Sequence, residues 1–156
     1  MSKYRKILKE IDIPMSIQEI DDHAFEGCTL LQQIIIPSSV KKIGIYAFTR
    51  CKSLRKIEIP HSVTNIEDYA FADCLLLEEI SLPPSLTSLG EYCFSGCSSL
   101  KNIVIPQAIS ILGKGLFTNC KLLKTVDGSF NVINDECFMG CTLLERISSQ
   151  LTVIDI

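Results

Sequence analysis

The eight cysteines are the most chemically reactive side chains in this 156-residue sequence, and six of them recur at a nearly constant interval. A cysteine can act as a nucleophile, bind a soft metal, form a disulfide or fill a core as a small apolar side chain. The regular column consists of Cys28, Cys51, Cys74, Cys97, Cys120 and Cys141. A uniform column gives each thiol two equivalent neighbours and no preferred disulfide partner, so we expect reduced thiols buried in a core.

The other two cysteines and the two histidines could in principle complete a metal or catalytic site. Cys93 and Cys137 each precede a column cysteine by four residues, but they are 44 residues apart, and a tetrahedral zinc site needs four converging ligands. His23 and His61 occupy different positions of the repeat, and a Cys–His nucleophile needs an exposed thiol in hydrogen-bond contact. We therefore expect no metal, no cofactor and no catalytic residue, and interpret both histidines as solvated or cap-like.

Composition and charge exclude several classes of partner. The net charge of -3 and the pI near 5.4 argue against nucleic acid, whose binding requires clustered Lys and Arg. No segment approaches the roughly 18 consecutive apolar residues of a membrane span, and residues 1–14 lack the apolar region of a secretory signal. The glycines of residues 112–116 only weakly match a phosphate loop, and turn geometry explains them better. The compartment stays open, cytoplasmic or associated with the cell surface.

An internal repeat of 23 residues, shortened once to 21, runs through the whole chain and predicts one domain over residues 1–156. Phenylalanines, leucines and isoleucines recur with the cysteines in fixed register. The phenylalanine column is Phe25, Phe48, Phe71, Phe94, Phe117 and Phe138. A unit this short cannot bury its apolar side chains alone, whereas stacked neighbours form a continuous core. The repeat therefore predicts a solenoid that needs neither metal nor disulfide for stability.

Each repeat can be divided into two short extended pieces and a turn. The segment Leu31 to Pro37 alternates inward and outward positions after its first residue, which is typical of a strand. Proline ends that strand because it lacks the N–H of a continuing ladder. A second extended stretch covers residues 40–43, and the spacing of Ala47, Phe48 and Cys51 predicts one helical or 3₁₀ turn. The expected fold is mostly β, with short parallel strands stacked along the solenoid.

The pattern Leu-x-x-Ile-x-Ile-Pro followed by Ala-Phe-x-x-Cys closely resembles the BspA-like, or treponemal-type, leucine-rich repeats from about Leu8 to Ile154. The resemblance implies a leucine-rich-repeat solenoid that binds proteins without enzyme chemistry. It also implies the alternative function of a cell-surface adhesin that binds host or matrix proteins. Both expectations name a protein as the partner.

The outward positions of the first strand in each repeat are the candidate partner-binding residues. They vary freely, whereas the inward positions barely change. The candidates are Gln33, Ile35, Lys56, Glu58, Glu79, Ser81, Asn102 and Val104. A solenoid aligns such positions into a wide surface, with Ile35 and Val104 as its apolar contacts. The alternative is a solvated sheet face without a partner.

Two further features could mediate association. Tyr46, Tyr69 and Tyr92 form an outer column that could either anchor a partner or cover the turn beneath it; we favour the second interpretation. The apolar C-terminal segment has no polar cap, which predicts a homodimer through this end. The residues predicted to associate are Leu151, Val153, Ile154 and Ile156.

Overall fold

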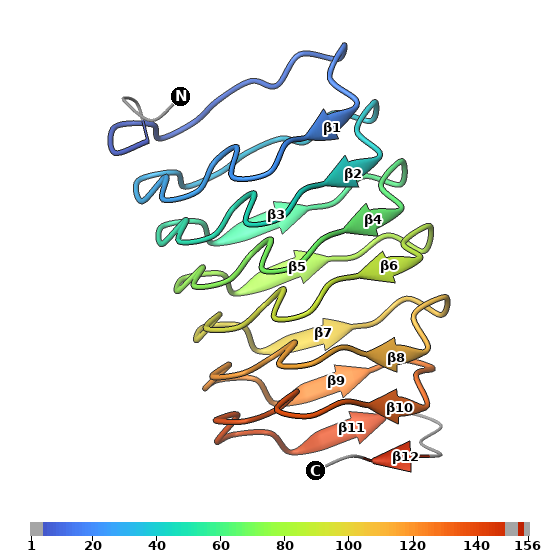
Figure 1. Cartoon of the computed structure of the whole chain (residues 1–156). Coiled ribbons are helices and arrows are strands. Elements are labelled where there is room, and N and C mark those ends of the chain that lie inside the picture. The colour runs from blue at the N-terminus through green and yellow to red at the C-terminus, as the bar shows by residue number, and fades with distance from the viewer. Residues whose placement is uncertain (1–4, 149–152, 155–156) are drawn as a thin grey trace.

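Two rows of short parallel strands run along the molecule (Figure 1). The first two repeats contribute a strand only to the second row, and each later repeat contributes one to both. The computed structural model describes residues 5–148 and the backbone of residues 153–154. The first strand row contains β3 (Lys56–Glu58), β5 (Glu79–Ser81), β7 (Asn102–Val104), β9 (Thr125–Asp127) and β11 (Arg146–Ser148). The second strand row contains β1 (Glu19–Ile20), β2 (Lys42–Ile43), β4 (Asn65–Ile66), β6 (Ser88–Leu89), β8 (Ile111–Leu112), β10 (Val132–Ile133) and β12 (Val153–Ile154).

We number the coils of the solenoid from the repeat that begins at Leu8, so that coils 2 to 7 begin at Leu31, Leu54, Leu77, Leu100, Leu123 and Leu144. Paired residues of adjacent coils are the residues that the repeat aligns, as in Ile57 with Ile80 and Val126 with Ile147. The shortened coil 6 keeps this register, since Ile133 pairs with Leu112 and Phe130 is fully buried. The predicted parallel solenoid is therefore confirmed.

In the turns of coils 1 to 5, hydrogen bonds within the turn alternate with hydrogen bonds to the next coil. In coil 2 the amide of Cys51 donates to the Phe48 carbonyl at 3.1 Å, a 3₁₀-type bond within the turn. The amide of Phe48, by contrast, donates to the Ala70 carbonyl of coil 3 at 2.7 Å. Because every second amide is bonded to the next coil, the turns form a third row, here called the turn row, instead of continuous helices. Residues 5–148 contain no α-helix and no 3₁₀ helix.

Two positions of the turn row have left-handed backbone geometry. Non-glycine residues with positive φ, unusual for L-amino acids, include Tyr46 at 56° and Asn119 at 60°. The first position is occupied in successive coils by His23, Tyr46, Tyr69, Tyr92, Gly115 and Glu136. The second is occupied by Gly27, Arg50, Asp73, Gly96, Asn119 and Gly140. Coils 1 to 6 all adopt this geometry in the turn that follows the second-row strand, whichever residue occupies the position.

The core lies between the three rows and is continuous along the solenoid. Phe48, Phe71, Phe94 and Phe117 are fully buried. Their rings stack on those of adjacent coils, with centroids 5.2 Å apart between Phe48 and Phe71. Since fully burying a large apolar side chain stabilises a protein by about 1.5–3 kcal/mol, this column and the neighbouring leucines and isoleucines hold the coils together.

Candidate interaction surface

The outward residues of the first strand row form one exposed surface, which we call the strand face. In β3 the side chains of Lys56 and Glu58 are exposed, whereas Ile57 between them is 2% exposed. Alternation of this kind follows from the pleat of a strand, which sends successive side chains to opposite sides. The register places Lys56 beside Glu79 and Glu58 beside Ser81. These four candidate residues therefore form a continuous patch on two hydrogen-bonded strands.

The remaining four candidates lie on the same face but outside the sheet formed by β3 and β5. Asn102 and Val104 are on β7, which pairs with β9 and not with β5. Gln33 and Ile35 lie in coil 2, where an isolated bridge joins Ile35 to Asp12. The structure thus aligns all eight candidates along the face, but it divides them among two sheets and the segment of coil 2 that carries the isolated bridge. Nothing in the spacing of the repeat predicts this division.

Two apolar side chains stand out on the strand face. Ile35 is 77% exposed and Val104 is 66% exposed. Isolated exposed apolar residues are common on protein surfaces, so exposure alone does not identify a binding site. Each of these two, however, lines a groove between coils, so partner side chains could contact it from two sides.

Three grooves cross the strand face, and the smallest, of about 360 Å³, is lined by residues 10–12 and 33–35. The first has a volume of about 620 Å³ and is lined by residues 32–36, 55–61 and 81–84. The second has a volume of about 460 Å³ and is lined by residues 78–82 and 101–104 together with Asp127. Each of the eight candidate residues lines at least one of them. His61 also lines the first groove, which the repeat position of this histidine, directly after a strand-ending proline, could have indicated.

The charged side chains of the strand face are largely paired with one another. Nζ of Lys56 lies 3.7 Å from a carboxylate oxygen of Glu58 and equally far from one of Glu79. Glu78, which directly precedes β5, accepts hydrogen bonds from Arg55 at 3.0 Å and from Lys101 at 3.1 Å. The two cations lower the pKa of Glu78, and the hydrogen bond from Lys101 is the largest cause. Exposed pairs of this kind contribute only about 0–1 kcal/mol each, so a partner can replace them at little cost.

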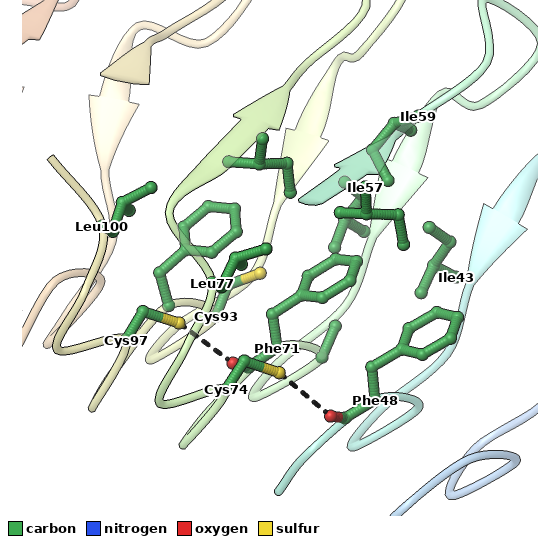
Figure 2. Close-up of a cluster of buried hydrophobic side chains, with 14 of the residues drawn as sticks. Ile43, Phe48, Ile57, Ile59, Phe71, Cys74, Leu77, Cys93, Cys97 and Leu100 are labelled. Carbon is green, nitrogen blue, oxygen red and sulfur yellow. Dashed lines mark hydrogen bonds between the residues drawn. The ribbon is translucent and has the colours of Figure 1, made fainter. Parts of the chain in front are cut away.

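The column cysteines have a structural role that explains their spacing. The thiol of Cys74 donates to the Phe48 carbonyl at 3.2 Å, and Cys97 donates to the Phe71 carbonyl at the same distance (Figure 2). Each thiol therefore links its coil to the preceding one. All eight cysteines are free, and burial raises the pKa of Cys74 to about 12. A thiol that remains protonated at neutral pH and has no access to solvent is a poor nucleophile.

The histidines do not share a site with any cysteine. His23 is exposed, and its Nδ1 lies 2.9 Å from a carboxylate oxygen of Glu26. Its ring stacks on that of Tyr46 with centroids 5.1 Å apart. His61 lines the first groove instead. Among residues 5–148, no group of three or more His, Cys, Asp or Glu side chains is arranged to hold a metal ion.

The outer tyrosine column forms a stack instead of a row of separate anchors. The rings of Tyr46, Tyr69 and Tyr92 lie parallel, with centroid distances of 4.8 and 5.0 Å. His23 extends the stack by one ring, a continuation that its position 23 residues before Tyr46 could have indicated. Neighbouring rings occupy both faces of Tyr46 and Tyr69. That the tyrosines cover the turn row stays our interpretation.

The residues predicted to self-associate lie at the C-terminal end of the chain. Leu151 and Ile156 lie outside the described residues. Of Val153 and Ile154 only the backbone is described, as β12, which pairs with β10. The homodimer therefore stays a prediction. A monomeric mass by light scattering at tens of micromolar would contradict it.

A solenoid with this strand face defines the molecule as a leucine-rich-repeat protein. A model of the BspA type leucine-rich repeat region, with six copies, matches residues 3–124 and 64–156. The chain therefore belongs to the BspA-type leucine-rich repeat family. Leucine-rich repeat proteins are generally non-enzymatic scaffolds for protein interaction. Among the described residues, no helix has the length and hydropathy to span a membrane.

Solved structures of bacterial proteins resemble the chain over most of its length. A leucine-rich repeat protein of T. pallidum is 33% identical with a TM-score of 0.84, and the match covers 92% of this chain and 70% of that one. A leucine-rich repeat protein from Eubacterium ventriosum is 25% identical with a TM-score of 0.71, over 90% of this chain and 48% of that one. The pneumococcal vaccine antigen PcpA shares the fold at 23% identity with a TM-score of 0.65, and the match covers 93% of this chain and 31% of that one. No curated protein sequence matches the chain.

Proposed function

We propose that the chain is a non-enzymatic scaffold that binds a protein partner through the strand face. The observation that supports this most strongly is that Ile35 and Val104, the two most exposed apolar residues of the face, each line a groove between coils. The proposed contact residues are Gln33, Ile35, Lys56, Glu58, Glu79, Ser81, Asn102 and Val104. Burying aliphatic side chains against a partner removes apolar surface from water, which favours association.

The charges of the face support a protein partner over other ligands. Lys56 lies between two carboxylates and Glu78 between two cations, so neither sign dominates the centre of the face. Nucleic acid would require a continuous basic stripe. A protein surface with apolar side chains and a few charges of both signs suits this face, because paired charges at a rim add specificity more than affinity.

A comparison of matched surface variants tests the proposal. The double variant Ile35→Ser, Val104→Ser removes both apolar contacts from the strand face. The control is Ile111→Ser, because Ile111 is 51% exposed but lies on β8 in the second strand row. Proteins captured by the wild-type chain and by the control, but lost with the double variant, are the expected result. Capture that is unchanged in the double variant would place the binding surface elsewhere.

The charged residues give a second, independent test. Charge reversal at Lys56, Glu58 and Glu79 inverts the centre of the strand face. We expect such variants to keep the fold, because the side chains are exposed, and to weaken partner binding at low salt more than at high salt. Intact binding after reversal of all three charges would count against this face.

The finer alternative of an extracellular adhesin for host or matrix proteins uses the same surface and differs in location. A leucine-rich cell surface protein from Faecalibacterium prausnitzii shares the fold at 20% identity, with a TM-score of 0.52 over 94% of this chain and 62% of that one. Surface labelling of intact cells tests the alternative. Labelling supports the adhesin, and a chain that labels only after lysis contradicts it.

A further inference from the structure

The boundary between coil 4 and coil 5 differs from the other boundaries between described coils. In the first strand row, β3 pairs with β5 and β7 pairs with β9 and β11, but β5 does not pair with β7. In the second strand row, β1, β2, β4 and β6 form one sheet and β8, β10 and β12 form another. Both rows are therefore interrupted at the same place. At the boundary between coils 2 and 3, by contrast, β2 and β4 remain paired.

Individual amides show the interruption directly in the first strand row. The amide of Ile59 donates across to the Ser81 carbonyl at 3.3 Å, and that of Ile105 donates to the Asp127 carbonyl at 2.7 Å. The repeat places Leu82 at the same position in coil 4, yet its amide does not donate to Val104. The groove of about 460 Å³ lies at this point.

The second strand row also lacks a backbone hydrogen bond between coils 4 and 5. The amide of Gly90 donates to the Ile66 carbonyl at 2.8 Å, and that of Asn134 donates to the Leu112 carbonyl at 3.0 Å. Gly113 is the equivalent residue in coil 5, and its amide does not donate to Leu89. Two strand rows on different sides of the core thus lack their inter-coil bonds at one boundary.

The core side chains on the coil 4 side of the boundary are incompletely covered. Leu82 occupies the position of Ile59 and Ile105, which are 6% and 2% exposed, but is itself only partly buried. Leu89 is also only partly buried, whereas Ile66 at the same position of coil 3 is fully buried. The boundary therefore buries less apolar surface than its neighbours do.

The turn row remains fully joined across the boundary. The amides of Tyr92, Phe94 and Gly96 donate to carbonyls of coil 5 at 2.9, 3.0 and 2.7 Å. The thiol of Cys120 donates back to the Phe94 carbonyl at 3.1 Å. On the opposite side, the connection between the first-row strands is the exposed ion pair of Lys101 with Glu78 at 3.1 Å. One edge of the boundary is thus joined by backbone hydrogen bonds, and the other is not.

We propose that this boundary is a hinge that divides the solenoid into two rigid blocks, coils 1–4 and coils 5–7. The bonded turn row is the axis, and the two strand rows open and close about it. In a solenoid each coil contacts only its neighbours, so the weakest interface between coils determines where the stack yields. Hinge motion changes the angle between the part of the strand face that carries Ile35 and the part that carries Val104. The inference concerns the free chain and does not depend on a partner.

Relaxation dispersion by NMR on the whole chain tests the hinge, because hinge motions occur on the microsecond to millisecond timescale. We expect exchange contributions for the methyl groups of Leu82 and Leu89 and for the amides around the boundary. Ile59 and Ile66, at the paired boundary between coils 3 and 4, serve as controls and should give flat profiles. Flat profiles at Leu82 and Leu89, or equal dispersion at every boundary, would overturn the proposal.

A pair of matched variants extends the test. Lys101→Gln removes the ion pair that crosses the edge without backbone hydrogen bonds and should increase the exchange contribution at Leu82 and Leu89 by at least about twofold, because the closed state loses a contact. Lys124→Gln removes the ion pair of Lys124 with Glu145, between coils 6 and 7, and should leave these methyl groups unchanged. An equal response to both variants, or no response to Lys101→Gln, would show that the edge does not open.

Discussion

The hydroxyl of Tyr92 donates a hydrogen bond of 2.8 Å to a carboxylate oxygen of Glu136, a residue two coils away in the stack. Between them lies Gly115, which has no side chain to separate the two. The bond therefore joins coil 4 to coil 6 along the turn row, across the boundary at which both strand rows are interrupted. Lys114 adds an ion pair with Glu136 at 3.6 Å. This connection supports the turn row as the fixed edge of the hinge.

Replacing Glu136 should change the titration of Tyr92. The hydrogen bond to Glu136 is the largest cause that raises the pKa of Tyr92. In Glu136→Gln the carboxylate no longer favours the protonated phenol, so the pKa of Tyr92 should fall toward the usual value of about 10. Absorbance of the phenolate followed against pH measures this. Glu145→Gln is the control, and identical titration of both variants would show that Glu136 does not act on Tyr92.

Alanine at Gly115 should destabilise the chain more than alanine at Gly27. Both glycines have positive φ, 60° and 69°, a geometry that costs an L-residue about 1–2 kcal/mol. A Cβ at Gly115 would also collide with the Tyr92 ring, whereas a Cβ at Gly27 meets nothing within 4 Å. We expect Gly115→Ala to cost roughly 1–3 kcal/mol more than Gly27→Ala, measured by urea unfolding. Equal losses would mean that the Tyr92 ring moves aside freely.

The column cysteines should make the chain less stable at alkaline pH. Burial raises the pKa of Cys74 from 9.0 to about 12, so the folded chain keeps its thiol proton where the unfolded chain loses it. The stability from this thiol is complete below pH 9 and is lost as the pH rises toward 12. At pH 10 the wild type should lose about 1.4 kcal/mol more than Cys74→Ala does, relative to pH 7.5. Urea unfolding under reducing conditions measures both, and parallel losses would contradict the buried, protonated thiol.

Replacing a phenylalanine of the column should destabilise the chain most in the middle of the stack. Phe71 is fully buried between Phe48 and Phe94, so Phe71→Ala removes contacts with both adjacent coils and should cost about 3–5 kcal/mol. Phe138 is only partly buried and stacks on Phe117 at 5.6 Å. Phe138→Ala should therefore cost clearly less in thermal or urea unfolding. A larger loss at Phe138 than at Phe71 would contradict stabilisation by nearest neighbours.

The sequence by itself determined the order and register of the coils. Because the chain advances by one coil per repeat, residues that the repeat aligns become neighbours in space, and the stacking of Phe48 on Phe71 follows from their 23-residue spacing. The same reasoning placed Lys56 beside Glu79 on the strand face. It also located Phe130 and Ile133 of the shortened repeat in the core. In a solenoid, sequence alignment and spatial contact carry the same information.

The tertiary structure alone decided how adjacent coils are joined. Leu82 and Ile59 occupy the same repeat position, yet only Ile59 bonds to the next coil. Hydrogen bonds need donor and acceptor within a few tenths of an ångström of the right distance, and this depends on packing along the whole stack. The thiol of Cys74 is a second example. A cysteine in a core column need not have a carbonyl within hydrogen-bond distance, but Cys74 does. The repeat determines which residues meet, and packing determines which bonds they form.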